Sequence, residues 1–228
     1  IGCEDGHVFT AIIPTLQRSP FLGPLLDMLA TSTLVRQVIV INNSAQPLGV
    51  ELPGVDIVTP GRNLYVNPAW NLGVSLATQD RIVIVNDDVV FPEPLLASVA
   101  DRLDRGAGIV GLDLSCLRVE PEQARPRFRR TYRRRYGFGA LMFMERANYV
   151  PIPDELLIYR GDDWLFRRQR RQNYVVTGVP VRASMGTTSM DPAFDAIRQR
   201  DVELFESGHA ANPNARRHPL GYAGARLR

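Results

Sequence analysis

Short apolar runs alternate along this chain with longer stretches in which apolar residues recur at helical spacing. Runs of β-branched apolar residues indicate strands buried on both faces, and the helical spacing indicates amphipathic helices. Pro14 is expected to end the first strand, because proline cannot donate to a strand ladder. The alternation predicts βαβ units and a mostly parallel sheet flanked by helices, an α/β fold. The predicted strands cover residues 7–13, 36–41, 55–58, 81–85 and 108–114, and the predicted helices cover residues 20–30, 67–77, 94–105 and 191–207.

Polar residues directly follow three of the predicted strands: Pro-Thr at 14–15, Asn-Asn-Ser at 42–44 and Asn-Asp-Asp at 86–88. A single Asn-Asp turn at a strand end is common. Three polar ends at one edge of a parallel sheet instead describe a crevice the size of a nucleotide. Carboxylates there can hold a divalent cation, which can in turn hold a diphosphate. The chain has no Gly-x-Gly-x-x-Gly after the first strand and no Gly-Lys-Ser/Thr, so dinucleotide and P-loop sites lose support.

The composition is that of a globular protein: of 228 residues, 45% are hydrophobic and 22% are charged, which fits one domain. No run approaches about 18 uninterrupted apolar residues, so no transmembrane segment is expected. The first residues lack the basic and apolar regions of a secretory signal. Cys3 and Cys116 are too few for a disulfide framework or a metal-ligand set. A cytoplasmic setting is therefore expected.

All 27 basic residues are arginine, and seven of them lie between positions 125 and 135, next to aromatic residues. Because a guanidinium group is a planar, bidentate phosphate ligand, this cluster can bind an anionic partner, with Arg130, Arg133 and Arg134 as candidate contacts. The alternative is a solvated loop whose arginines pair with acidic residues elsewhere. The cluster consists of Arg125, Arg127, Arg129, Arg130, Arg133, Arg134 and Arg135, interleaved with Phe128, Tyr132 and Tyr136.

Several short motifs occur in a recognisable order. Residues 12–18 read Ile-Ile-Pro-Thr-Leu-Gln-Arg and residues 38–44 read Val-Ile-Val-Ile-Asn-Asn-Ser; Gly-Arg-Asn follows at 61–63, Asn-Leu-Gly at 71–73 and Val-Asn-Asp-Asp-Val at 85–89. Together they resemble the nucleotide-sugar half of family 2-like glycosyltransferases with the GT-A fold. Residues 137–146 resemble the family's Gly-rich strand with a closing arginine, and residues 159–167 resemble its acidic motif at the start of a helix.

This resemblance implies a single GT-A (Rossmann-like) domain over residues 1–228. Its nucleotide-sugar-binding half would be 8–115 and its acceptor and catalytic half 116–190. A C-terminal helix and a loosely ordered tail would follow over 191–228. The residues implied to bind the nucleotide sugar are Pro14, Thr15, Arg18, Asn42, Asn43, Arg62, Asn71, Asn86 and Asp87.

The resemblance also implies a metal ion. Residues 86–88 match the family's Asp-x-Asp motif with its first Asp replaced by Asn, so Asp88 is the implied ligand of Mg²⁺ or Mn²⁺. One departure bears on this site. Many members supply a late histidine to the metal, but residues 181–189 contain none, and His209 and His218 lie downstream. The metal site could then be completed by water or replaced by arginine, and the segment 187–189 could close over the diphosphate.

Asp162 and Asp163 stand where the family keeps its catalytic base, with Asp163 as the implied base and Asp162 as its neighbour. Trp164, next to them, is a candidate acceptor contact. An inverting transfer needs a carboxylate to take the proton of the acceptor hydroxyl as that oxygen attacks the anomeric carbon. The alternative is structural, because Asp in the first turn of a helix caps N–H groups and suits the helix dipole.

The function implied is transfer of a sugar, with inversion, from a nucleotide-diphosphate sugar that is UDP-linked or linked to another pyrimidine. The acceptor stays open between a glycan, a lipid-linked glycan and a hydroxyl-bearing modified base of DNA, which would have to be flipped out of a duplex. Two other classes remain. A nucleotidyltransferase would show a Gly-rich basic loop after the first strand, which residues 14–18 do not form. A catalytically inactive nucleotide-sugar-binding module is compatible with Asn86 and the missing histidine.

Overall fold

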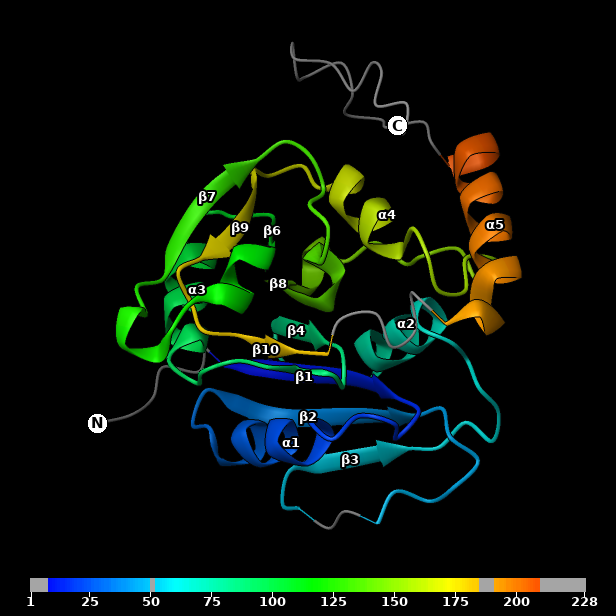
Figure 1. The fold of residues 1–228 in the computed structure, drawn as a ribbon, viewed down its shortest axis with the longest axis horizontal. Helices are drawn as coiled ribbons and strands as arrows, with labels where there is room; N and C mark the ends of the chain where they lie inside the picture. The colour runs from blue at the N-terminus through cyan, green and yellow to red at the C-terminus, as the bar shows by residue number, and fades with distance from the viewer. Residues whose placement is uncertain (1–7, 50–51, 185–190, 210–228) are drawn as a thin grey trace.

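The computed structural model describes residues 8–49, 52–184 and 191–209. Within these ranges one sheet of eight strands runs through the molecule (Figure 1). From one edge to the other the strands are β3 (Val55–Val58), β2 (Val35–Asn42), β1 (Phe9–Thr15), β4 (Arg81–Val85), β8 (Leu141–Glu145), β6 (Ile109–Leu112), β9 (Asn173–Thr177) and β7 (Arg127–Thr131). A two-stranded sheet pairs β5 (Val89–Val90) with β10 (Arg182–Ala183).

The first half of the sheet is parallel, as the alternating pattern predicts: β3, β2, β1 and β4 all run the same way. The expectation that Pro14 ends the first strand is wrong, because β1 continues to Thr15 with Pro14 in register with Ile41. The ladder between β1 and β4 already ends at Ile12, opposite Ile84. A proline two residues beyond that point therefore removes no hydrogen bond with β4.

The second half of the sheet is mixed. β8 inserts antiparallel between β4 and β6, and β7 closes the far edge antiparallel to β9. The strand predicted over 108–114 forms as β6, and β8 separates it from β4. Because six of the eight strands share one direction, the predicted mostly parallel α/β sheet is confirmed.

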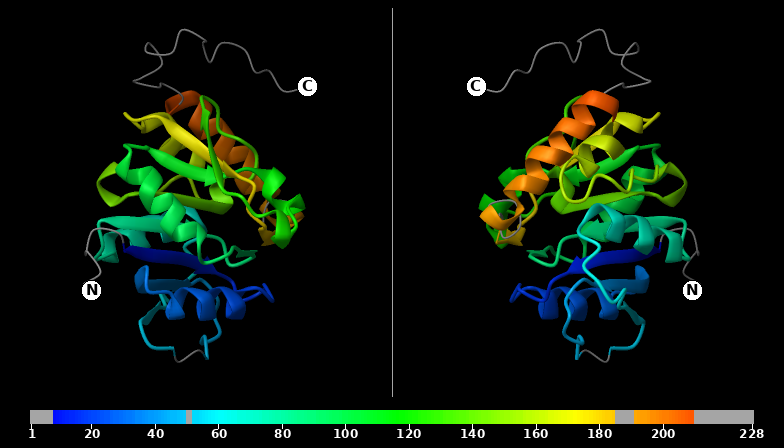
Figure 2. Two further views of the ribbon diagram at one scale, coloured as in Figure 1. Left: turned by 90° about the vertical axis from the view of Figure 1, so that its left-hand side faces the viewer. Right: turned by 90° about the vertical axis from the view of Figure 1, so that its right-hand side faces the viewer.

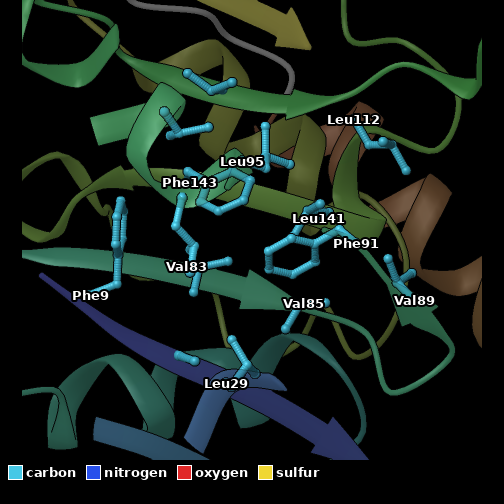
Figure 3. Packing of buried hydrophobic residues seen from close by; sticks show 14 of the residues in the cluster. Phe9, Leu29, Val83, Val85, Val89, Phe91, Leu95, Leu112, Leu141 and Phe143 are labelled. Atoms are coloured by element: carbon cyan, nitrogen blue, oxygen red, sulfur yellow. The ribbon is translucent and has the colours of Figure 1, made fainter. Parts of the chain in front are cut away.

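Helices cover both faces of the sheet. On one face α1 (Leu22–Thr31) and α3 (Leu95–Asp104) share a buried cluster with Val83 and Phe143, in which Phe143 packs edge-on against Phe9 and Phe91 (Figure 3). On the other face α2 (Asn67–Leu76) and α4 (Gly161–Arg168) pack over Ile82 and Ile84. Successive residues of β4 thus contact the helices on opposite faces, which explains why residues 82–85 are all apolar.

Near the end of the described residues lies α5 (Asp195–Leu204), which follows a short 3₁₀ turn over Pro192–Phe194 capped by the Asp191 side chain and continues into a π-helical turn over Phe205–His209. Figures 1 and 2 place α5 beside α4 and the segment that leads into it. In the part of the chain that the structure describes, no helix has the length and apolar character needed to cross a membrane. The predicted tail over 212–228 and the segment 187–189 lie outside the described residues.

Candidate active site

A cleft of about 590 Å³ opens at the carboxyl ends of β1, β2 and β4. Its floor comes from the strand ends, and its opposite wall comes from the start of α4, the segment after β7 and the side of α5. Parallel strands bring their carboxyl ends to one edge, so this is where a doubly wound sheet binds ligands. Ten residues predicted from the sequence line this one cleft: Pro14, Thr15, Arg18, Asn43, Asn86, Asp87, Asp88, Arg134, Asp162 and Asp163.

A short hydrogen bond joins the ends of β1 and β4. The Thr15 hydroxyl donates to Asp87 Oδ2 at 2.6 Å, and the backbone N–H of Gln17 donates to the Thr15 oxygen at 2.8 Å. Burial raises the pKa of Asp87 above its usual value, the Thr15 hydrogen bond opposes this, and the charge of Asp88 adds to it. Asp87 is thus a carboxylate fixed in place at the floor of the cleft.

Asp88 is buried beside it, and its backbone carbonyl accepts from the N–H of Ser184, just after β10. Among the described residues no group of three or more His, Cys, Asp or Glu side chains could hold a metal ion. The pair Asp87 and Asp88 nevertheless suits Mg²⁺ or Mn²⁺ in the form in which substrate phosphates and water supply the other oxygens. The protein side of such a site consists of one or two carboxylates.

The two asparagines that end β2 do different things. Asn43 lines the cleft and holds the segment at its mouth, since its side chain donates to the Tyr65 carbonyl and accepts from the Leu64 N–H. The Asn42 side chain bonds instead to Gln17, Ser44 and the Gln46 carbonyl, which places it below the cleft lining. Asn42 therefore shapes the loop that follows β2.

Asp162 and Asp163 occupy the first turn of α4, as the sequence predicts. Two glycines allow the close approaches on which this position depends. A Cβ on Gly161 would overlap the Asn67 amide, and a Cβ on Gly139 would lie 2.9 Å from Asp162 Cβ. The Asp162 side chain also accepts the backbone N–H of Asp163 at 2.9 Å. A capping role, the structural alternative, is thus present together with exposure of both carboxylates to the cleft.

Arginines surround this acid pair. Arg134 Nε and Arg160 Nη1 each lie 3.2 Å from Asp163 Oδ2, and Arg134 Nη1 lies 3.5 Å from Asp162 Oδ2. Burial raises the pKa of Asp162 to about 6, the positive charge of Arg134 opposes this, and the negative charge of Asp163 adds to it. Burial alone would lower the pKa of Arg134, but the two carboxylates raise it above its usual value. The pair therefore holds a carboxyl group that titrates near neutral pH, a property of general acids and bases.

Helix α5 holds the segment that carries these groups. Asp201, fully buried, accepts the backbone N–H groups of Leu157, Ile158 and Tyr159 at 3.2, 2.8 and 2.9 Å. Sequence reasoning missed Asp201, although its spacing of four from Ile197 and from Phe205 puts it on the apolar side of the helix. A lone aspartate on such a face was the available signal.

Six sequence candidates, Asn42 included, do not line the cleft. Asn71 bonds through its side chain to both backbone groups of Ile152, and the indole of Trp164 is buried and donates to the Pro151 carbonyl. Arg62, Arg130 and Arg133 are exposed. Seven further polar residues line the cleft without having been predicted as site residues, namely Ser19, Asn63, Tyr65, Tyr136, Tyr159, Arg160 and Arg198. His218, which lies downstream of the segment where many family members supply a histidine, is outside the described residues.

The comparisons with known proteins agree with this geometry. The sequence model of a family described as "Glycosyl transferase family 2" matches residues 10–169. No curated protein matches the chain significantly. Among solved structures, S. aureus TarS residues 1–349 has 13% sequence identity and a TM-score of 0.55, and the match covers 75% of this chain and 60% of that one.

The same TarS fragment in complex with UDP gives 14% identity, a TM-score of 0.56 and coverages of 75% and 60%. A longer S. aureus TarS structure has 16% sequence identity and a TM-score of 0.57, and the match covers 87% of this chain and 40% of that one. The chain thus spans 60% or less of the length of these proteins. At such identities the likeness shows a shared fold.

Proposed function

The chain belongs to glycosyl transferase family 2, whose sequence model covers residues 10–169, and we propose that its cleft transfers a sugar from a nucleotide-diphosphate sugar to an acceptor hydroxyl, with inversion. One observation carries this proposal. The carboxylates at the end of β4 and the acid pair at the start of α4, far apart in sequence, line one cleft, in which Arg134 contacts the acid pair. The carboxylates at the end of β4 are suited to hold a metal ion with the donor diphosphate, and the acid pair is suited to take the proton of an acceptor hydroxyl.

The donor nucleotide lies against the strand ends in this proposal. Pro14, Thr15 and Arg18 from the end of β1 and Asn43 from the end of β2 contact the base and ribose. UDP or another pyrimidine nucleotide is the proposed carrier, which is consistent with the UDP present in one structure of similar fold. Arg62 is exposed outside the cleft lining, so a donor contact from it requires a movement of the segment 60–63.

Asp88, with Asp87 as its second partner, would hold Mg²⁺ or Mn²⁺ together with the donor phosphates. The ion, when bound, neutralises charge that develops on the leaving diphosphate. Thr15 keeps Asp87 in position through its 2.6 Å hydrogen bond. Asn86 in the first position of the motif is proposed to contact the donor as a neutral amide.

Asp163 is the proposed base. It takes the proton of the acceptor hydroxyl while that oxygen forms a bond to the anomeric carbon. The bond from this carbon to the diphosphate oxygen breaks on the opposite side, and its electron pair leaves with the nucleoside diphosphate. Asp162, whose N–H-accepting side chain fixes the first turn of α4, orients Asp163. General base catalysis of this kind typically contributes a factor of about 10²–10⁴ to the rate.

The donor site is tested by thermal unfolding with a panel of nucleoside diphosphates, each with and without Mn²⁺. A ligand that binds only the folded state raises the melting temperature by mass action. We expect a shift with one nucleotide, increased by Mn²⁺ and abolished by Asp88→Ala. Asp101→Ala, at an exposed carboxylate of α3, is the matched control and should respond like the wild type. A panel without any shift would contradict the proposal.

Catalysis is tested by release of the nucleoside diphosphate from the sugar donor. Asp163→Asn should lower the rate by about 10²-fold or more while the nucleotide-dependent shift in melting temperature persists. A chain that binds the nucleotide but consumes no donor would be a binding module. A chain that releases pyrophosphate from a nucleoside triphosphate would be a nucleotidyltransferase.

A further inference from the structure

Arg134 differs from the rest of the arginine cluster in where its side chain lies. It reaches into the cleft and contacts both Asp162 and Asp163, with 26% of its side chain exposed. The cluster members Arg127, Arg129, Arg130, Arg133 and Arg135 are exposed, and none of them forms an ion pair with a carboxylate of the described residues. A row of exposed guanidinium groups therefore leads from the edge strand β7 to Arg134, which is ion-paired with the acid pair.

This pairing affects the proposed base directly. Both Arg134 and Arg160 contact the same oxygen of Asp163, Oδ2, at 3.2 Å. The oxygen that would receive the proton of the acceptor hydroxyl is therefore already in contact with two guanidinium groups.

The two arginines are not held equally. Arg160 precedes α4 with φ at +67°, follows the segment bonded to Asp201, and also lies 3.7 Å from Glu206. Arg134 lies in the segment after β7, between the exposed neighbours Arg133 and Arg135. Apart from the acid pair, its guanidinium contacts the Arg135 carbonyl in its own segment. Of the two, Arg134 is the group whose departure from the acid pair breaks no contact with another helix.

An anion is the partner that would draw Arg134 away. Guanidinium groups bind phosphate in a planar, bidentate manner, and the exposed arginines beside Arg134 add positive charge along the approach. Tyr132 and Tyr136 are two of the three large hydrophobic side chains that are exposed among the described residues, at 48% and 64%. Each lies two residues from Arg134 in sequence, and both offer flat apolar surface to the rest of an acceptor molecule.

We propose that Arg134 is a positioning residue that pairs with Asp163 in the empty cleft and moves to an anionic, phosphate-type group of the acceptor when the acceptor binds. This inference rests on the proposed function and adds the chemical class of the acceptor to it. Asp163 then keeps only Arg160, its Oδ2 is open to the acceptor hydroxyl, and the hydroxyl is deprotonated when the correct acceptor is in place. Water, which carries no such anion, meets a base that is still paired.

Binding is measured first, without donor, so that the result does not depend on turnover. The probes are glycerol 2-phosphate and glycerol, which present the same primary hydroxyls with and without a phosphate. Glycerol 2-phosphate should stabilise the wild type and leave Arg134→Ala almost unchanged, while glycerol stabilises neither. Arg36→Ala, at an exposed arginine near the start of β2, should bind like the wild type. Equal stabilisation of the wild type and Arg134→Ala would overturn the inference.

Turnover with the donor found in the nucleotide panel is measured next. The wild type should use glycerol 2-phosphate with a kcat/KM at least about tenfold above that for glycerol, the effect expected of one charge-assisted contact. Arg134→Ala should lose this preference and hydrolyse the donor in water faster than the wild type. Arg134→Lys, which keeps the charge but not the planar fork, should retain part of the preference.

Three outcomes would contradict the inference. Equal use of both acceptors by the wild type would show that the site does not select an anionic acceptor. A preference that survives in Arg134→Ala would show that Arg134 does not provide the selection. Stimulation of glycerol transfer by free inorganic phosphate to the rate of glycerol 2-phosphate would show that the acceptor need not carry the anion. If instead no nucleotide stabilises the protein, the proposed function fails first, and the binding result with glycerol 2-phosphate still reports on Arg134.

Discussion

The hydroxyl of Thr15 donates a hydrogen bond of 2.6 Å to Asp87 Oδ2 and so ties the end of β1 to the residue that follows β4 by two positions. The two strands pair only as far as Ile12 and Ile84. Beyond that point this side-chain contact continues the connection between the strands, at the floor of the cleft. The backbone N–H of Gln17, which has a positive φ of 60°, orients the hydroxyl from the other side.

Thr15→Val should weaken donor binding because valine has nearly the same shape but cannot hold Asp87. A hydrogen bond to a charged group is worth about 1.5–3 kcal/mol, so the affinity for nucleotide with Mn²⁺ should fall at least about tenfold. The measurement is calorimetric titration of the nucleotide found in the thermal panel. Thr10→Val, in the same strand at the far end, removes a hydroxyl that bonds to Gln37 and is the control. Equal affinity losses in both variants would show a general effect on β1.

Asp201→Asn should destabilise the wall of the cleft. The carboxylate accepts three backbone N–H groups from residues 157–159, and an amide of the same shape accepts fewer and carries no charge. We expect a loss of about 2–4 kcal/mol in the free energy of unfolding, measured with urea, and faster hydrogen exchange at these three amides.

Asp195→Asn is the control for Asp201. Asp195 lies in the same helix, and its ion pair with Arg198 is exposed, so its loss should cost under about 1 kcal/mol. If Asp201→Asn costs no more than this control, or leaves the exchange of the three amides unchanged, the bonds to Asp201 do not hold the segment.

The parallel half of the fold follows from local pattern. β3 and β4 begin and end where predicted, because each is a short β-branched run bounded by polar residues, glycine or proline. The mixed half does not follow in the same way. Whether residues 141–145 pair with β4 from the side and direction observed depends on how the chain returns after β6, and apolar runs carry no information on that path.

The candidate site was likewise predictable in part. The polar strand ends and the acid pair could be placed at one cleft, because parallel topology and the family's motif order specify it. Which way each side chain points could not be derived. Asn71 and Trp164 lie in motifs near the site, yet Asn71 satisfies the backbone of Ile152 and Trp164 packs in the core. Of the clustered arginines, only the fold shows that Arg134 is the one that meets Asp163.

Gly161→Ala should disturb the acid pair through packing alone. A Cβ at this position would overlap the side chain of Asn67, which is buried and donates to the Leu156 and Tyr159 carbonyls. Forcing an extra methyl group into a packed site typically costs about 1–3 kcal/mol, and here it would also displace the first turn of α4. The expected results are a lower urea midpoint and reduced donor turnover.

Gly23→Ala provides the comparison for Gly161→Ala. Gly23 lies in α1, and a Cβ there meets no atom within 4 Å. Since alanine favours a helix over glycine, this variant should be as stable as the wild type or up to about 1 kcal/mol more stable. Similar losses in both variants would mean that the site of the substitution does not matter and that the contact with Asn67 is not the cause.

The pH dependence of stability should reveal Asp162. Its pKa is about 6 in the folded protein against an ordinary value of 3.8, because burial disfavours the charged form, with Arg134 opposing and Asp163 adding to the shift. A folded-state pKa above the unfolded value contributes stability that is complete below pH 3.8 and is lost as the pH rises through 6. The free energy of unfolding of Asp162→Asn, which stays neutral throughout, should therefore rise relative to that of the wild type between pH 4 and pH 7, by at most about 3 kcal/mol for a shift of roughly two units.

Urea unfolding at constant ionic strength measures this difference. Asp101→Asn, at an exposed carboxylate, is the control, and its difference from the wild type should not change with pH. The positive charges of Arg134 and Arg160 lower the pKa of Asp162 and so oppose the effect of burial. A difference that instead grows in favour of the wild type with rising pH would mean that their attraction exceeds the cost of burial.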